Sequence, residues 1–204
     1  MFEGSIVALI TPFRDGQIDE AALSALVEWQ VGAGTDGLVP VGTTGESPAL
    51  SHNEHKRVID LCIEAAGRRV PVIAGAGSNY TEEAISLAAH ARSAGANGVL
   101  VVTPYYNKPT QEGMYRHFST IAEGVNKPVI LYHVPDRTGV VLNPETVIRL
   151  SQHGNIIGIK EATGELERVQ PLREGCHADF CLLSGDDGTS CEFILSGGDG
   201  VISV

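Results

Sequence analysis

Eight short apolar runs recur along the whole chain, and they restrict its fold more than any other feature. Each run has the length of a β-strand and is apolar almost throughout, instead of alternating apolar and polar residues. Continuous apolar runs are typical of parallel strands that are covered on both faces. The eight runs are SIVALIT (5–11), GLVPVG (37–42), VPVIAG (70–75), GVLVVTP (98–104), PVILYHVP (128–135), NIIGIKEA (155–162), DFCLLSGD (179–186) and GVISV (200–204).

Helical patterns lie between the apolar runs. Residues 19–34 carry apolar side chains at helical spacing, and Asp19 is predicted to cap the start of that helix. A second helix is predicted to begin at Thr81 as its N-cap and to end at Gly95. A third is predicted to begin after Asn143, because a proline follows in the first turn.

Strands that alternate with helices predict a parallel α/β fold, and eight of them fit a (β/α)8 TIM barrel in a single domain. A weak internal repeat supports this prediction: AGTDGLVPV (33–41), AGANGVLVV (94–102) and SGGDGVISV (196–204) each look like a helix end, a turn and a strand. A doubly wound sheet is the alternative. The segment GAGSNY (75–80) resembles its nucleotide-binding fingerprint, but Tyr80 occupies the place of the third glycine.

Charge and cysteine usage exclude several classes of function. The formal net charge of −11 argues against a nucleic acid partner. No apolar run reaches the length of a membrane span, and the first is too short for a signal peptide. The four cysteines have no zinc-site spacing, so we expect reduced thiols in a cytoplasmic protein.

Polar segments follow several of the predicted strands. Active sites of barrels form at the carboxyl ends of the strands, so these segments should meet on one rim. They are GTTGES (42–47), TPYYNKP (103–109), YHVPDRTG (132–139), KEATG (160–164) and SGDDG (184–188).

Lys160 is the one lysine of four that directly follows an apolar run. Burial disfavours the charged form of an amine and lowers its pKa. A neutral amine can attack a carbonyl carbon and form a Schiff base. The alternative is a structural lysine that pairs with Glu161 or extends to water at the rim. The residues alone leave both interpretations open.

Three neighbouring features have a functional and a structural interpretation. Tyr132 could relay protons near the amine, or be a core tyrosine. The GTTG turn could offer backbone N–H groups to a carboxylate, or be an ordinary turn. Arg137 could bind a carboxylate through two hydrogen bonds, or form a surface ion pair with Asp136.

Taken together, GTTGES, TPYYNKP, YHVPDRTG, IIGIKEATG and LLSGDD resemble the dihydrodipicolinate synthase family of pyruvate-dependent class I aldolases, which includes N-acetylneuraminate lyase. The resemblance runs in order along all 204 residues. It implies a cytoplasmic lyase of lysine and diaminopimelate biosynthesis. The implied reaction condenses pyruvate with L-aspartate 4-semialdehyde to give 4-hydroxy-tetrahydrodipicolinate. The resemblance also implies that no metal or organic cofactor is needed and that the protein is a homo-oligomer, a dimer of dimers.

The resemblance assigns catalytic roles to four residues. Lys160 matches the Schiff-base lysine of the family, and Tyr132 matches its general acid/base. Thr44 and Tyr106 match the other two hydroxyls of the proton relay. In the family the tyrosine that Tyr106 matches enters from the neighbouring subunit of a tight dimer.

Further matches imply substrate-binding positions. Thr43 and Thr44 match the turn that holds the carboxylate of pyruvate, and Arg137 matches the residue that receives the carboxylate of the semialdehyde. Gly185 and Ile202 match backbone positions that line the pocket.

The resemblance also implies a regulatory site. Lysine-sensitive members of the family bind L-lysine at a dimer interface, whereas the structural alternative here is a solvated loop and helix face. The matching positions are Ser47, His52, His55, Asn79, Glu83 and Tyr105.

The substrate assignment depends on fewer residues. Sugar-acid lyases of the family share the lysine and the tyrosine, but GTTGE, Arg137 and PYYNKP favour the dipicolinate synthases. His133 stands where the family usually has Asn, and strand alternation should point it away from Tyr132, with little expected effect on the mechanism. A phosphate-binding barrel enzyme is disfavoured by acidic residues in the last two rim loops, namely Asp186, Asp187 and Asp199.

Chains of the family are longer than this sequence, which ends in the eighth apolar run. The sequence-based expectation is therefore a barrel truncated after its eighth strand, without the final helix and the C-terminal helical domain. An apolar strand face without its cover would make the 204-residue chain alone prone to aggregate, with little synthase activity. An inactive fragment is accordingly the alternative to an enzyme.

Overall fold

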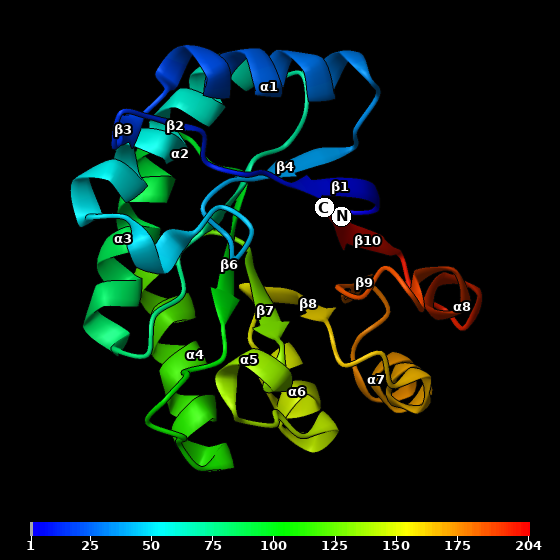
Figure 1. Ribbon diagram of the computed structural model, residues 1–204. Coiled ribbons are helices and arrows are strands. Elements are labelled where there is room, and N and C mark those ends of the chain that lie inside the picture. The colour runs from blue at the N-terminus through cyan, green and yellow to red at the C-terminus, as the bar shows by residue number, and fades with distance from the viewer. Residues whose placement is uncertain (1) are drawn as a thin grey trace.

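The computed structural model describes residues 2–204. Eight parallel strands form its central sheet, and they alternate with helices along the chain (Figure 1). The strands are β1 (Gly4–Ala8), β4 (Gly37–Val39), β5 (Ile73–Gly75), β6 (Gly98–Val102), β7 (Val129–His133), β8 (Ile156–Glu161), β9 (Cys181–Ser184) and β10 (Gly200–Ser203). The helices between them are α1 (Glu20–Gly32), α2 (His52–Ala66), α3 (Thr81–Ala94), α4 (Gln111–Val125), α6 (Pro144–Ser151), α7 (Val169–Gly175) and α8 (Ser190–Leu195).

The strands follow one another around a barrel in the order β4-β1-β10-β9-β8-β7-β6-β5. A parallel bridge between Leu38 and Val72 joins the two end strands, and Gly75 N–H donates to Pro40 O at 3.0 Å. The helices surround the strands, from α1 through α4 and α6 to α8 (Figure 1). This topology confirms the predicted (β/α)8 barrel and excludes the doubly wound sheet.

Two apolar clusters fill the barrel and its surroundings. Side chains from alternate strand positions, among them Ile6, Ile73, Leu100 and Ile202, form the cluster inside the barrel. A larger cluster lies between the strands and the helices and buries apolar side chains of α1 to α4 and of α6 to α8. Most strands are covered on both faces, one by each cluster, so their sequences are apolar almost throughout. The outer faces of β1 and β10 are less covered, since Val7, Val201 and Ser203 are only partly buried.

The predicted helix boundaries are confirmed at three ends, Asp19, Gly95 and Asn143, and wrong at one. The Asp19 carboxylate accepts a hydrogen bond from Ala22 N–H at 3.0 Å, as an N-cap does, and Gly95 ends α3 with a φ of 103°. Thr81 is not the N-cap of α3 but its first helical residue. Its hydroxyl bonds instead to His117 Nδ1 on α4, 2.9 Å away, so a tertiary contact uses the group that was expected to cap the helix.

Shorter elements shape the loops at the carboxyl ends of the strands. They are the hairpin β2 (Phe13–Arg14) and β3 (Gln17–Ile18), the 3-10 helices η1 (Ser47–Ala49) and η2 (Leu166–Arg168), and α5 (Pro135–Thr138). No helix within residues 2–204 is long and apolar enough to cross a membrane. The four cysteines are all free thiols, as the sequence predicted.

Candidate active site

A cavity of about 620 Å³ opens at the carboxyl ends of the barrel strands. It gathers seven of the eight predicted catalytic and substrate-binding residues from five separate segments of the chain. These residues are Thr43, Thr44, Tyr132, Arg137, Lys160, Gly185 and Ile202. Four of the five polar segments that were predicted to meet on one rim therefore line this cavity, whereas TPYYNKP (103–109) does not.

Lys160 is the penultimate residue of β8, and its side chain extends into this cavity. The residue is only 7% exposed, whereas Lys56, Lys108 and Lys127 are half-buried or exposed. Burial lowers the pKa of the Lys160 amine to about 8, and the negative charge of Asp187 partly opposes that shift. A substantial fraction of the amine is therefore neutral near pH 8 and available as a nucleophile.

The alternative pairing of Lys160 with Glu161 does not occur. Strand alternation places the Glu161 side chain on the opposite face of β8, where it contacts His133 and Arg168. Lys160 instead pairs in register with Tyr132 of β7, and its amine lies 4.5 Å from the centre of the Tyr132 ring. The amine and the phenol are thus neighbours at the floor of one cavity.

Contacts with neighbouring segments fix the conformation of the GTTG turn after β4. Thr11 Oγ donates to Gly45 O at 2.7 Å, and Val41 adopts a φ of 50°, which is unusual for a β-branched residue. A Cβ on Gly75 would lie 2.2 Å from Val41 O, so only glycine allows this approach. Within residues 2–204 the backbone N–H groups of Thr43 and Thr44 have no acceptor, which leaves them free to bind a carboxylate.

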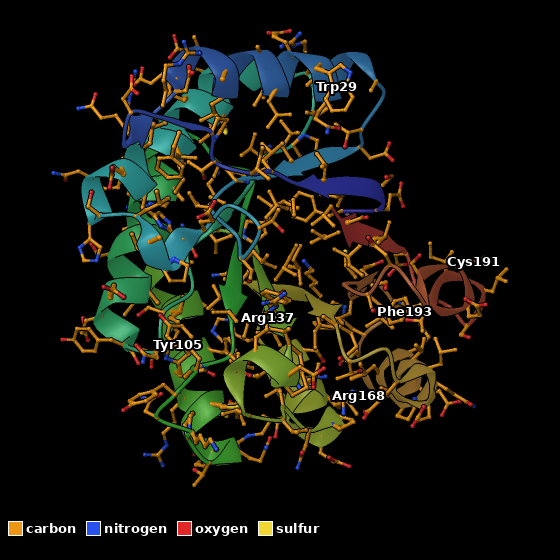
Figure 2. The ribbon with its side chains drawn as sticks, viewed as in Figure 1. Trp29, Tyr105, Arg137, Arg168, Cys191 and Phe193 are labelled. Carbon is orange, nitrogen blue, oxygen red and sulfur yellow. The ribbon has the colours of Figure 1, made fainter. Side chains whose placement is uncertain are left out.

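Arg137 lies on α5, the four-residue helix that follows β7, and it is exposed at the edge of the cavity. It is near the centre of the view in Figure 2. Among residues 2–204 no carboxylate forms an ion pair with its guanidinium, so the predicted surface pair with Asp136 is absent. A free guanidinium beside the cavity is suited to bind the carboxylate of a substrate.

Gly185 provides the space that the Lys160 side chain occupies. A Cβ at this position would lie 2.7 Å from Lys160 Cε and 2.7 Å from Ala162 Cβ. We expect Gly185→Ala to displace the amine and to slow imine formation by about 10²-fold, the scale of a 1 Å misplacement. The rate of borohydride trapping with pyruvate measures this, and Gly154→Ala is the control, because a Cβ there has nothing within 4 Å. A wild-type trapping rate in Gly185→Ala would contradict the role of this glycine.

Tyr106 is the one predicted catalytic residue that is not among the residues lining the cavity. It lies in the loop after β6 with a φ of 70° and is 88% exposed. An aromatic side chain held outward on a strained backbone is not explained by the packing of a single chain.

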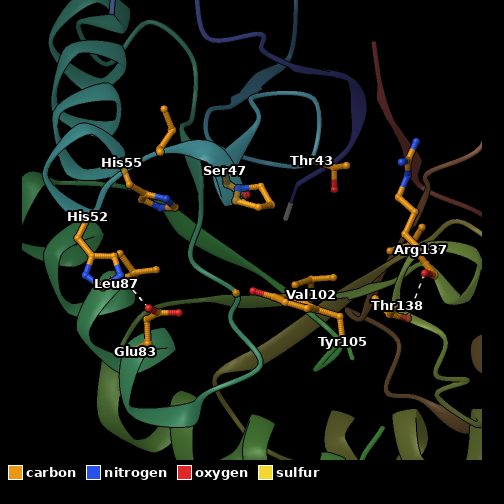
Figure 3. Close-up of a pocket in the computed structure, with 14 residues that line it drawn as sticks. Thr43, Ser47, His52, His55, Glu83, Leu87, Val102, Tyr105, Arg137 and Thr138 are labelled. Atoms are coloured by element: carbon orange, nitrogen blue, oxygen red, sulfur yellow. Dashed lines mark hydrogen bonds and ion pairs between the residues drawn. The ribbon is translucent and has the colours of Figure 1, made fainter. Parts of the chain in front are cut away.

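A second cavity, of about 450 Å³, adjoins the first and shares Thr43, Val134 and Arg137 with it. Figure 3 shows His52 and Glu83 on one side of it and Arg137 on the other. Five of the six predicted regulatory residues line this cavity: Ser47, His52, His55, Glu83 and Tyr105. The sixth, Asn79, is not part of the lining, and its carbonyl oxygen accepts from Asn107 Nδ2 at 3.2 Å.

Glu83 is the one acidic residue among the described residues that line the second cavity. Its carboxylate contacts the Ser78 hydroxyl and, at 2.7 Å, His52 Nε2. The hydrogen bond from Ser78, with a further contribution from His52, holds the pKa of Glu83 below its ordinary value although burial opposes this. An ionised carboxylate is therefore available to a cationic ligand. His55 donates to Gly75 O at 2.8 Å, and burial lowers its pKa.

Sequence reasoning missed several residues of the active-site cavity. Asp136 and Asp187 line it, and Asp187 acts on the pKa of Lys160. Each lies three residues beyond the end of a strand, and this position was the available signal. Asp199, which was expected in the same rim, is instead bonded to Arg173 and Leu182 N–H. Among residues 2–204 no group of three His, Cys, Asp or Glu side chains is arranged to hold a metal ion.

A desolvated lysine at the carboxyl end of the sixth strand of a (β/α)8 barrel, beside a phenol and a turn with two unpaired backbone N–H groups, is typical of barrel aldolases that act through an amine nucleophile. Comparison with known proteins gives the particular family. The sequence model of the dihydrodipicolinate synthetase family matches residues 1–204, and the chain belongs to this family.

Similar proteins agree with this assignment. The 4-hydroxy-tetrahydrodipicolinate synthase of Agrobacterium fabrum is 61% identical over 206 residues, which cover all of this chain and 70% of that protein. The structure of the chloride-inhibited dihydrodipicolinate synthase of Acinetobacter baumannii complexed with pyruvate is 50% identical, with a TM-score of 0.97. The lysine-bound enzyme of Cyanidioschyzon merolae is 40% identical, also with a TM-score of 0.97. Each structure is matched by the whole of this chain over 70% of its own length.

Proposed function

We propose that the protein condenses pyruvate with L-aspartate 4-semialdehyde through a Schiff base on Lys160, giving 4-hydroxy-tetrahydrodipicolinate in the cytoplasmic biosynthesis of lysine and diaminopimelate. The observation that carries the proposal is the buried Lys160 amine, with its pKa lowered to about 8, in a cavity with Tyr132 and Arg137. Membership of the family supports the same substrates.

The geometry suggests how the first step proceeds. The neutral Lys160 amine attacks the keto carbon of pyruvate, whose carboxylate is bound by the N–H groups of Thr43 and Thr44. Tyr132, on the neighbouring strand, is placed to give a proton to the carbonyl oxygen, which leaves as water when the imine forms. The hydroxyl of Thr44 and the hydroxyl of Tyr106 from a second copy of the chain extend the proton relay toward solvent.

The imine prepares pyruvate for the condensation. Its positive charge makes the methyl protons acidic, so loss of one proton gives an enamine. The enamine carbon then attacks the aldehyde carbon of the semialdehyde, the aldehyde oxygen takes up the proton, and the imine on Lys160 forms again. The amine of the semialdehyde then attacks the imine carbon, which closes the ring and releases Lys160 as the free amine. Arg137, exposed at the mouth of the cavity, is suited to bind the carboxylate of this second substrate while the chemistry occurs at Lys160.

Arg137→Ala separates the two substrates. We expect the KM for L-aspartate 4-semialdehyde to rise by about 10- to 100-fold, because one charge-assisted hydrogen-bonded contact is lost. Borohydride trapping of pyruvate should persist at the wild-type rate. Steady-state turnover with aspartate semialdehyde and with sugar aldehydes as competing substrates measures the preference, and Arg116→Ala on the exposed face of α4 is the control. Equal loss of pyruvate trapping, or preferred turnover of sugar aldehydes, would count against this assignment.

We propose that the second cavity binds L-lysine as a feedback inhibitor. The ionised Glu83 carboxylate suits the ammonium group of the ligand, and Tyr105 and Ser47 offer hydroxyls at the other side of the cavity. The existence of a lysine-bound structure of a similar protein supports this proposal.

Glu83→Ala is expected to relieve inhibition by L-lysine, raising the inhibitory concentration by about 10-fold or more, since it removes a partner of the ligand's charge. Glu82→Ala is the matched control, because it removes the same charge from the neighbouring, exposed residue. Inhibition is measured on the condensation rate and lysine binding by calorimetry. Unchanged binding in Glu83→Ala would rule out the role of this carboxylate.

A homo-oligomer is part of the same proposal. Tyr106 is exposed and held on a strained backbone at the rim of the barrel, where a second copy of the chain could receive it. In that arrangement two chains would complete each other's proton relay. A dimer of such dimers is the proposed full assembly.

A further inference from the structure

A second pair of residues lies directly behind the candidate catalytic pair. Tyr132 faces Lys160 across β7 and β8, and the next residues, His133 and Glu161, are also partners in register. Strand alternation points them to the outer side of the barrel. His133 is fully buried and Glu161 is 2% exposed, and Arg168 of η2 joins them there. Figure 2 shows Arg168 on the side of the barrel where α6 and α7 lie.

The carboxylate of Glu161 is the centre of a hydrogen-bonded network. His133 Nδ1 lies 2.9 and 3.0 Å from its two oxygens, and Arg168 Nε donates to Oε2 at 2.9 Å. Thr163 N–H donates to Oε1 at 3.1 Å. Burial would raise the pKa of Glu161, but the contacts with His133 and Arg168 together hold it below its ordinary value. The carboxylate is therefore ionised, and both of its oxygens accept hydrogen bonds.

The hydrogen bonds define the protonation of His133. Leu142 N–H donates to His133 Nε2 at 3.0 Å, so Nε2 must be the unprotonated nitrogen. The proton is consequently on Nδ1, which donates to Glu161. The histidine is neutral, and the one positive and one negative charge of the network, Arg168 and Glu161, balance each other. Arg168 Nη2 also donates to Leu142 O at 2.7 Å, so both backbone groups of Leu142 are held.

The network ties together three segments that carry the proposed reactive residues. His133 ends the strand of Tyr132, and Glu161 ends the strand of Lys160. Leu142 belongs to the connection that follows α5, the helix of Arg137. Within residues 2–204 neither the Lys160 amine nor the Tyr132 hydroxyl makes a hydrogen bond. Their positions are accordingly set by the backbone of the two strands, which this network clamps.

We propose that the buried network of His133, Glu161 and Arg168 is a positioning device for the Tyr132–Lys160 pair, and that the bond between His133 and Glu161 is its decisive contact. The proposal rests on the proposed Schiff-base chemistry. None of the three residues touches the substrate, because their side chains lie behind the strands. Their effect is expected on the rate of imine formation rather than on the binding of pyruvate.

Two substitutions of His133 separate its two hydrogen bonds. His133→Asn places an amide near the position of Nδ1, so it keeps a donor to Glu161 and loses the bond to Leu142. His133→Gln places its amide near the position of Nε2, so it keeps the hydrogen bond with Leu142 N–H and loses the hydrogen bond to Glu161. A positioning role through Glu161 predicts that His133→Asn forms the imine at nearly the wild-type rate. His133→Gln and Glu161→Gln should be slower by about 10²-fold, with the KM for pyruvate nearly unchanged.

The matched control is Glu28→Gln, which breaks the exposed two-bond pair of Glu28 with Arg69. The rate of borohydride trapping is measured per folded molecule, well below the melting temperature of each variant. Slow trapping in His133→Gln with wild-type trapping in His133→Asn supports the proposal. If Glu161→Gln fails to fold, the comparison of the two His133 variants is sufficient to test the proposal. Wild-type rates in both His133 variants, with lowered melting temperatures only, would overturn it. Absence of trapping in the wild-type protein would instead refute the Schiff-base function itself, and with it this proposal.

Discussion

Replacing Lys160 with alanine should abolish the trapping of pyruvate by borohydride and lower turnover by more than about 10³-fold, because the variant lacks the nucleophile. In the wild-type protein, reduction should add one pyruvate-derived mass to the peptide that contains Lys160. Lys127→Ala is the control, since Lys127 is a half-buried lysine away from the cavity. Trapping that survives in Lys160→Ala would show that another amine is the nucleophile.

The pH dependence of trapping follows from the environment of the same amine. Burial lowers the pKa of Lys160 to about 8, and only the neutral amine attacks a carbonyl. The rate of imine formation should therefore rise as the pH increases through about 8, and at two pH units below this value roughly 1% of the amine is reactive. Asp187→Asn should move the midpoint to lower pH, because the Asp187 charge raises this pKa. A midpoint near the ordinary value for lysine would contradict the desolvation of the amine.

Tyr132→Phe should have the second largest effect. It removes the hydroxyl that we propose moves protons beside Lys160, while it keeps the ring that packs 4.5 Å from the amine. Loss of a general acid/base typically costs about 10²- to 10⁴-fold in rate. We expect kcat to fall by this amount, while pyruvate is still trapped slowly on Lys160.

Tyr115→Phe is the matched control for this substitution, because Tyr115 is on α4, outside the cavity, and its ring lies under the guanidinium of Arg149 on α6. The two variants are compared by steady-state kinetics and by the time course of trapping. A turnover rate in Tyr132→Phe within a few-fold of the wild type would mean that water or another hydroxyl carries the proton.

The barrel and the buried lysine could be predicted from local pattern. Strands covered on both faces must be apolar throughout, so the eight runs indicated parallel strands before their order was known. The position of Lys160 directly after such a run indicated desolvation, and the structure gives both the burial and the lowered pKa. Four of the five polar segments after the strands converge on one cavity as expected, because parallel strands present their carboxyl ends on the same rim.

The second cavity was predictable only in part. Five of the six matched residues line one cavity, but Asn79 does not, because its position depends on the path of the loop between β5 and α3. Likewise, Thr81 has the residue type of an N-cap, yet its hydroxyl contacts His117 on a neighbouring helix. The local preference of a residue for capping a helix is a weak predictor wherever a residue of another element competes for the same hydroxyl.

What the sequence by itself determined is the set of periodic elements and the chemistry at their ends, since both depend on short stretches of chain. Only the tertiary structure decided which side chains contact one another. His133 was expected to point away from Tyr132, and it does, but the pattern did not indicate that Glu161 and Arg168 would meet it. Glu161 stands next to Lys160 in the sequence but on the opposite face of β8. It therefore bonds to His133 of the neighbouring strand β7 and not to Lys160. Such pairings arise from the register of strands and the packing of helices, which bring together residues that are 7 to 35 positions apart in the chain.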